Sequence, residues 1–424
     1  MKLAEKLKKM FLKIIDWFIS KPKRVIRFLV LFVCSIVVAF QLCECLMKLL
    51  NPPISTHSHF DLNGTLHYPA VTFCREPAFK EDILSKYNLS IHPSMTSSWK
   101  NFPFETSSLS DVFEESTYSR EEFFNIYALN GNRSNIAIDS TMTLTYGRCF
   151  TLKPRVSTDL PWKSSGYSIT LRHDHKEEFE DASNTEPPGF HVYLHDPRET
   201  FTEHGILSSG RIEYIYLYAN EEMELKLTVQ QFTKNRARGI KCSDNHMKST
   251  SICHEMCRWK SVEEVVKCVG PWIKHSSAPQ CNNYHDVRDL IVQYKYLSTI
   301  NESVCGCLEP CLSVLYSSFV MYRKRFSENG YDPGSQIYIY YTSKMITNIE
   351  ERAGYDFSQF IADMGGSLGF LLGLSVIGLI VALEKILGYL FLDKLIKNNE
   401  EKANENVENA EKAEKHRNEP SQVF

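Results

Sequence analysis

A glycine-rich apolar run near the carboxyl end of the sequence is the feature with the most chemical consequence. Residues 364–383 carry no charge, yet they include five glycines and two serines. Each glycine weakens a helix by roughly 1 kcal/mol relative to alanine, and contact with lipid does not require it. A small-residue packing face accounts for Gly365, Gly369 and Gly373 but leaves Gly366 and Gly378 unexplained. The run therefore indicates close helix contact or backbone that faces a water-filled path.

Ten of the thirteen cysteines lie between the apolar segments at the two ends, and their spacing predicts a ladder of disulfides. Cys253 and Cys257, four apart on a helix, lie about 6 Å apart on one face. This matches the roughly 6.6 Å between Cys305 and Cys307 in extended chain. The predicted pairs are Cys257 with Cys305, Cys253 with Cys307, Cys242 with Cys311, Cys268 with Cys281, and Cys74 with Cys149. Thiolate ligation of zinc is the alternative, but oxidised extracellular cysteines do not bind zinc.

Motifs for catalysis are missing from the sequence. It contains no Gly-x-Ser-x-Gly elbow followed by a placed Asp and His, no His-Glu-x-x-His and no Walker loop. His173-Asp174-His175 could bind a metal ion, but in a charged loop it is interpreted as a solvated pair. We expect no enzyme activity, no metal site and no cofactor. The net charge of −3 says little about partners, and we expect no nucleic acid among them.

Two apolar segments position these residues relative to a membrane. Residues 25–47 are predicted to form a first transmembrane helix, and residues 360–392 a second one that contains the glycine run. Nine lysines and arginines crowd residues 2–27, which places residues 1–24 in the cytoplasm. The second span returns residues 393–424 to the cytoplasm as a disordered tail. We therefore expect a multi-pass protein of the plasma membrane with both termini inside.

Residues 48–359 are expected outside the cell as a disulfide-rich α+β domain. All four glycosylation sequons fall there, at Asn63, Asn88, Asn132 and Asn301. Alternating apolar residues predict strands at 66–74, 211–229 and 336–342, and helical arms are expected at 254–269 and 283–297. Residues 80–130, with helical patterns such as 118–129, are interpreted as surface decoration.

Five motifs in this order resemble the degenerin/epithelial sodium channel family, also called amiloride-sensitive sodium channels. They are Tyr68-Pro69-Ala70-Val71-Thr72-Phe73-Cys74, His195-Asp196-Pro197, Cys305-x-Cys307-x-x-x-Cys311, Tyr340-Tyr341-Thr342-Ser343 and Asp363-x-Gly365-Gly366-x-x-Gly369-x-x-x-Gly373-x-Ser375. The residues of the first motif and the short tail look most like those of the insect pickpocket branch.

The resemblance implies a homotrimer, or a heterotrimer with related subunits, around a central pore in the lipid bilayer. It implies a β-sheet palm, a helical thumb at about residues 242–311, and sodium-preferring conduction opened by force or by an unknown extracellular ligand. Glu384 is the only acidic residue between the start of the apolar stretch at residue 364 and Asp393, so we expect it to line the pore. The implied site residues are Gly373, Leu374 and Ser375 for selectivity, Gly366 and Gly369 for the pore lining, and Ala362 and Asp363 for gating.

Three departures from the family pattern keep a second function open. The His-Gly pair expected before the first span is missing from residues 16–22, and Val381 stands where many relatives carry glutamate. No aromatic residue precedes Cys242. A non-conducting accessory or receptor subunit is therefore an alternative. An ATP-gated trimeric channel is more remote, because the glycine series and the cysteine cluster argue against it.

Overall fold

The computed structural model describes residues 22–62, 64–89, 92–173, 187–208, 211–235, 242–243, 249–274, 276–296, 305–326 and 334–372, with residues 378, 380, 381, 384 and 385. The predicted residues Asn63, Asn301, Gly373, Leu374 and Ser375 and the tail at 393–424 lie outside this set. The chain divides into two compact units, named here after the locations expected from the sequence: a membrane unit, Met1–Ile54 with Ala353–Phe424, and an extracellular unit, Ser55–Arg352.

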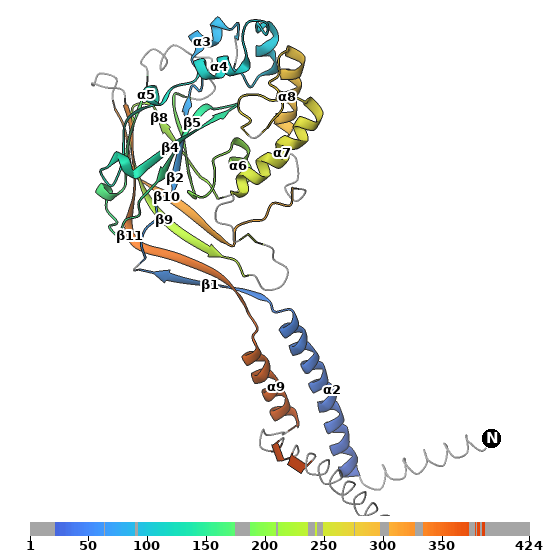
Figure 1. Ribbon diagram of the computed structural model, residues 1–424. Coiled ribbons are helices and arrows are strands. Elements are labelled where there is room, and N and C mark those ends of the chain that lie inside the picture. Colours follow the sequence, from blue (N-terminus) through green and yellow to red (C-terminus); the bar gives the residue numbers. More distant parts are fainter. Residues whose placement is uncertain are drawn as a thin grey trace, which may run out of the picture. The chain divides into compact units, whose positions relative to one another are not determined.

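The described part of the membrane unit includes the helices α2 and α9 (Figure 1). Helix α2 spans Pro22–Leu50, and its stretch Phe28–Leu50 is long and apolar enough to cross a bilayer; no other helix among the described residues meets that test. Helix α9 spans Phe357–Leu372, so it begins three residues before the predicted start of the second span. The two ends of the unit meet where the Gly354 amide donates to the Pro53 carbonyl at 2.6 Å.

Two β-sheets form the extracellular unit. The six-stranded sheet runs in the order β10 (Leu312–Arg325), β9 (Glu221–Thr233), β11 (Gly334–Ala353), β6 (Tyr167–Arg172) and β3 (Phe124–Leu129), with β1 (Ile54–Asp61) also paired to β11. The five-stranded sheet runs in the order β4 (Ile136–Thr143), β5 (Gly147–Pro154), β2 (Ala70–Glu76), β7 (Gly189–His195) and β8 (Glu213–Tyr218). Residues of both sheets bury one shared apolar core.

The alternating pattern predicted at 211–229 corresponds to two strands, β8 and β9. Met223, Leu225, Leu227 and Val229 are all buried on one face of β9. The chain turns between the two strands at Asn220, whose φ of 58° places it in the left-handed region that asparagine tolerates. Strand β11 continues eleven residues past the predicted end at 342, to Ala353.

The strand predicted at residues 66–74 is shorter than expected. Strand β2 begins at Ala70, because the preceding carbonyls bond to tyrosine side chains in place of a neighbouring strand. The Tyr167 hydroxyl donates to the Pro69 carbonyl at 2.9 Å, and the Tyr341 hydroxyl donates to the His67 carbonyl at 2.7 Å.

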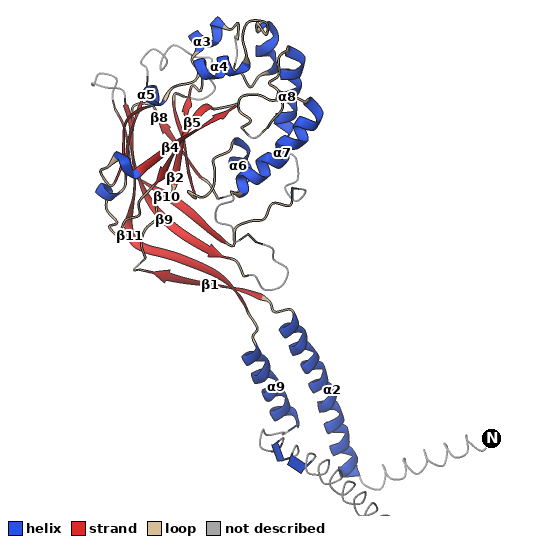
Figure 2. Cartoon of the chain, viewed as in Figure 1, coloured by secondary structure: helices blue, strands red, loops and turns tan. Residues whose placement is uncertain are grey.

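Short helices surround one end of the strands (Figure 2). A hairpin is formed by α7 (Thr250–Val266) and α8 (Tyr284–Tyr296), close to the predicted arms. The remaining helices are α3 (Glu81–Lys86), α4 (Leu109–Ser116), α5 (Arg120–Phe123), α6 (Glu203–Ser208), and the 3-10 helices η1 (Thr96–Asn101), η2 (Arg133–Asn135) and η3 (Lys163–Ser165).

The interpretation of residues 80–130 as surface decoration is wrong. Trp99, Val112 and Phe113 are fully buried, and they share a second apolar core with Trp272 and Leu290 of the hairpin region. The helical pattern at 118–129 is also only partly correct, because α5 ends at Phe123 and the chain continues as β3. Phe124 and Tyr127, whose spacing of three also suits one face of a helix, are both buried in the sheet core because β3 has a bulge between Phe124 and Ile126.

Candidate functional site

The predicted pore and gating residues that the structure describes lie on or beyond α9. Ala362, Asp363, Gly366 and Gly369 are exposed in the single chain, and Glu384 lies in a helical position beyond the end of α9 and is also exposed. A Cβ atom added at Gly365 or Gly366 would meet nothing within 4 Å. Other described parts of the chain therefore leave the space beside these two glycines open.

The start of α9 is tied to the residue predicted for gating. The Tyr355 hydroxyl donates to Asp363 Oδ2 at 2.9 Å, which joins the segment before the helix to its second turn. Asp356 caps the helix by accepting from the Gln359 amide at 2.8 Å. The pair Asp356 and Gln359 has the spacing of a capping box, so this signal was present in the sequence.

The five disulfides of the extracellular unit join the predicted pairs. Cys253 and Cys257 of α7 bond to Cys307 and Cys305, with Cα–Cα distances of 6.0 and 5.8 Å. The other pairs are Cys242 with Cys311, Cys268 with Cys281, and Cys74 with Cys149. The ladder holds the segment that leads into β10 against α7.

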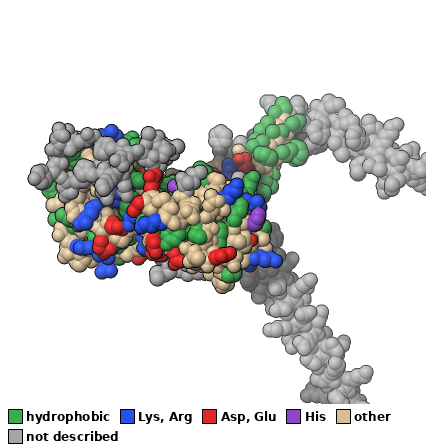
Figure 3. All heavy atoms as spheres, turned by 90° about the horizontal axis from the view of Figure 1, so that it is seen from above, with side chains coloured by type: hydrophobic (Ala, Val, Ile, Leu, Met, Phe, Trp, Pro, Cys, Tyr) green, Lys and Arg blue, Asp and Glu red, His purple; other side chains and the backbone are tan. Residues whose placement is uncertain are grey.

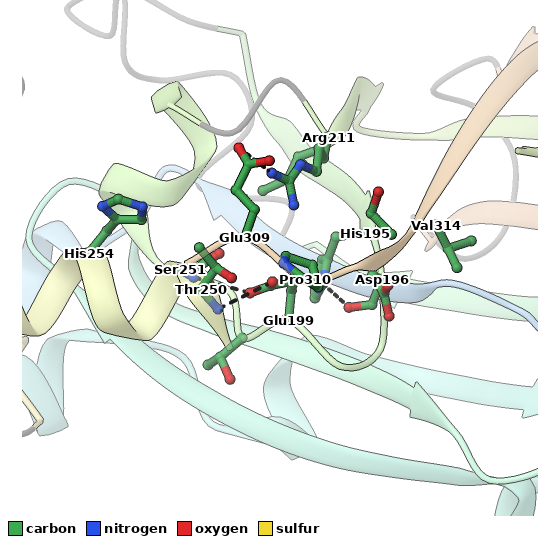
Figure 4. A pocket seen from close by; sticks show the side chains of 13 residues that line it. His195, Asp196, Glu199, Arg211, Thr250, Ser251, His254, Glu309, Pro310 and Val314 are labelled. Carbon is green, nitrogen blue, oxygen red and sulfur yellow. Dashed lines mark hydrogen bonds and ion pairs between the residues drawn. The ribbon is translucent and has the colours of Figure 1, made fainter. Parts of the chain in front are cut away.

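Glu199 connects the loop after β7 to the first turn of α7 (Figure 4). Its Oε2 accepts from the Ser249 hydroxyl at 2.6 Å and from the Ser251 amide at 3.1 Å, while its Oε1 accepts from the Thr250 amide at 3.3 Å. A carboxylate at this position satisfies helix amides that have no partner within the helix and interacts favourably with the helix dipole. The loop that carries the His195-Asp196-Pro197 motif thus positions the hairpin.

Three ion pairs lie in the same region, close to the start of β10. Arg198 Nε donates to Asp196 Oδ1 at 2.9 Å, and Arg198 Nη2 donates to the Leu312 carbonyl at 3.2 Å. Glu309 Oε1 pairs with Arg211 Nη2 at 2.9 Å, and its Oε2 pairs with Lys234. Of these side chains, Asp196, Arg211 and Glu309 line a cavity of about 80 Å³, which holds water-sized molecules at most (Figure 4).

His195 and His173 of the extracellular unit are buried in the neutral form. His195 bonds to the Thr72 hydroxyl at 2.9 Å and to the Asp196 carbonyl at 3.1 Å, and burial lowers its pKa to about 4. His173 is also buried, with its ring 4.4 Å from that of Phe190, and burial together with the Arg75 cation lowers its pKa well below the usual range. The expected solvated pair at His173 is therefore incorrect, and His175 lies outside the described residues.

Two carboxyl groups near the hairpin, those of Glu203 and Glu255, have pKa values above the usual range. Glu203 accepts from the Leu144 amide at 3.0 Å, and desolvation raises its pKa. Desolvation likewise raises the pKa of Glu255 on α7, with a smaller contribution from the charge of Glu203. Within the described part of the chain, no three His, Cys, Asp or Glu side chains are grouped so that they could hold a metal ion.

The predicted glycosylation sites that are described are accessible. Asn88 and Asn132 are both exposed, and the Asn132 side chain accepts from the Ser134 amide at 2.9 Å. The visible face of the extracellular unit carries charged side chains of both signs, interspersed (Figure 3).

Glu199, Arg211 and Glu309 were not predicted from the sequence, because their partners lie far away along the chain. Only Ser249, a typical N-cap residue before an expected helix, carried a local signal.

The chain is similar in sequence to a known family and to a characterised channel, and a solved structure aligns with it. The model of a family described as amiloride-sensitive sodium channel matches residues 15–383. The human bile acid-sensitive ion channel is 22% identical over 429 aligned residues, covering 88% of this chain and 81% of that protein. A solved structure of a proton-activated chloride channel aligns with 85% of this chain and 96% of its own, at 8% identity and a TM-score of 0.34, too low to bear on the fold.

Proposed function

The chain belongs to the amiloride-sensitive sodium channel family, and we propose that it is a subunit of a sodium-preferring cation channel of the plasma membrane, opened by a stimulus on its extracellular unit. This is a family of ion channels, not of enzymes, and the assignment removes the ATP-gated channel as an alternative. The human relative is named for its sensitivity to bile acids, which supports an extracellular ligand as the stimulus.

The observation that best supports this function is the continuity of β11. Ile337, Ile339 and Tyr341 of this strand are buried in the sheet core, and the strand ends at Ala353. Only three residues separate it from Phe357, where α9 begins. A displacement of the sheet therefore reaches the second membrane segment through a short, hydrogen-bonded connection that includes Tyr355 and Asp363.

Ion selection is proposed to take place at Gly373, Leu374 and Ser375, where backbone carbonyls would replace the hydration shell of sodium. Gly366, Gly369 and Glu384 are proposed to line the pore, and Ala362 and Asp363 to take part in gating. The open space beside Gly365 and Gly366 in the single chain supports a trimer, in which this face of α9 meets a neighbouring subunit or the pore.

A non-conducting accessory subunit is the second candidate. Val381 is exposed at a helical position where many relatives carry glutamate, so one source of negative charge in the pore is absent. If this residue difference abolishes conduction, the chain would assemble with other subunits and supply only extracellular contacts.

Expression of the chain alone in oocytes separates the two candidates. Two-electrode recording with sodium replaced by potassium is expected to show an amiloride-sensitive current with a positive reversal potential in sodium. Surface labelling provides the control for assembly. Protein that reaches the surface without current under any stimulus, but carries current when a related subunit is added, would establish the accessory role instead.

A further inference from the structure

A cleft of about 500 Å³ opens at one end of the two-sheet core. One wall consists of strand ends in the five-stranded sheet: residues 65–68 before β2, 154–157 after β5, and 196–198 after β7. The other wall consists of β9, β10 and β11 of the six-stranded sheet. The volume lies within the range of roughly 300–1,000 Å³ that is typical of small-molecule sites.

The inner wall of the cleft is mostly apolar and continuous with the core. Tyr316 of β10 pairs across the ladder with Val229 of β9, and Val229 in turn pairs with Ile346 of β11. These three side chains are almost completely buried, at 2%, 5% and 5% exposure. They form the packed floor of the cleft, which the sheet ladder fixes in position, and an occupant would contact only their edges.

Polar groups of the inner wall can orient an occupant. The cleft is also lined by Tyr68, Tyr316 and Gln231, which supply two phenolic hydroxyls and one amide. Burial raises the pKa of both phenols, so they stay protonated and can donate hydrogen bonds. Such a wall suits a compact apolar body that carries hydrogen-bond acceptors.

The charge at the cleft is positive. Asp196 is already paired with Arg198, through contacts of 2.9 Å at Nε and 2.5 Å at Nη2. Arg155 is exposed at the rim, and it forms no ion pair among the residues that the structure describes. A ligand anion would therefore find a free guanidinium, whereas a cation would meet only a carboxylate that is already neutralised.

We propose that this cleft binds a small organic monoanion with a rigid apolar body, such as an aromatic or alicyclic carboxylate, with the carboxylate at Arg155 and the body against Tyr316, Val229 and Ile346. The consequence for gating rests on the proposed channel function. In β11, the pairing with β9 passes from Tyr341 opposite Leu227 to Ile346 opposite Val229, so residues 342–345 form a bulge next to the cleft. An occupant that fits one arrangement of this bulge better than another shifts the equilibrium of the strand that leads to α9.

Equilibrium dialysis of the full chain in nanodiscs tests the binding claim, with empty nanodiscs as the blank. The probes share one ring system: 2-naphthoate, neutral 2-naphthamide and cationic 2-naphthylmethylammonium. We expect saturable binding of naphthoate and weaker binding of the other two. Arg155→Gln should weaken naphthoate binding roughly tenfold and leave naphthamide unchanged, while Arg155→Lys retains most of the affinity. Arg288→Gln, at an exposed arginine of α8, is the matched control and should change nothing.

The proposal is overturned if naphthoate shows no saturable binding at millimolar concentration, if Arg155→Gln binds it as the parent does, or if the cationic probe binds equally well. Dialysis does not depend on conduction, so a chain that carries no current can still confirm the site. In a conducting chain, naphthoate should shift the stimulus response of the parent and not that of Arg155→Gln. Binding without that shift would refute only the coupling to gating, and the binding site itself would stand.

Discussion

The carboxylate of Glu199 accepts a hydrogen bond from the hydroxyl of Ser249 at 2.6 Å, across 50 residues of sequence. Ser249 in turn accepts from the Ile252 amide at 3.3 Å, so the two side chains together satisfy the first turn of α7. The hairpin with its disulfide ladder is thereby attached to the loop after β7.

Glu199→Gln should loosen this attachment. The amide retains hydrogen bonds but loses the charge that favours the helix start, so we expect a loss of about 1–2 kcal/mol in the free energy of unfolding. Thermal unfolding of the purified full chain measures the loss, and recording measures any change in stimulus sensitivity. Glu264→Gln, exposed on the same helix, is the control. Equal behaviour of the two variants would contradict the capping role.

Ala362 on α9 is predicted to sit where the second spans crowd together when the channel is closed. A larger side chain there should disfavour the closed packing more than the open one. Ala362→Val, and more strongly Ala362→Phe, should give a standing inward sodium current that amiloride blocks. Surface-labelled Ala362→Val protein that passes no current, where the parent responds to its stimulus, would show that the assignment is wrong.

Glu384 is predicted to concentrate cations in the pore, because carboxylates within membrane segments normally face water or a partner. Glu384→Gln should lower the single-channel conductance and weaken block by divalent cations, and both are measured in excised patches. Asp393→Asn, just beyond the second apolar stretch, is the control. An unchanged conductance and block would assign Glu384 to a helix-end ion pair instead.

The burial of His195 should make the extracellular unit sensitive to acid. Its folded-state pKa of about 4 lies below the ordinary 6.5, so the folded protein binds fewer protons than the unfolded one between these values. The free energy of unfolding that depends on neutral His195 is therefore fully present above pH 6.5. It falls by on the order of 3 kcal/mol as the pH falls towards 4. The raised pKa values of Glu203 and Glu255 act in the opposite direction.

His195→Gln should therefore flatten the fall in unfolding temperature between pH 6.5 and 4, because glutamine keeps hydrogen-bonding groups near Thr72 and Asp196 without titrating. Thermal unfolding across this pH range provides the measurement. His285→Gln, at an exposed position of α8, should leave the slope unchanged. The burial argument fails if the His195→Gln slope equals that of the parent.

The disulfide ladder predicts a difference between single and double cysteine replacements. Cys257→Ser leaves the thiol of Cys305 free to mispair, whereas Cys257→Ser with Cys305→Ser removes only one rung and keeps Cys253 joined to Cys307. Surface biotinylation should show lower expression of the single variant. Mass spectrometry of the non-reduced parent should recover the linked peptides, and crossed pairs among these four cysteines would contradict the register.

Local periodicity in the sequence was enough for β9 and for the helical side of the ladder. The alternation at 223–229 identifies the buried face of β9, and the spacing of Cys253 and Cys257 places both on one face of α7. The predicted rungs form, although Gly306 has a φ of 61° and the chain between Cys305 and Cys307 is not the extended strand that was expected. The start of α9 carried its own signal in Asp356 and Gln359.

Contacts between distant segments were decided by the tertiary structure alone. Nothing near Glu199 in the sequence points to Ser249, and nothing near Arg155 indicates that it rims a cleft walled by β9, β10 and β11. The burial of His173 and of Trp99 likewise depends on which elements pack over them. The periodicity of a segment predicts which face of its helix or strand each side chain occupies. The packing of the whole chain decides which charge or surface meets that face.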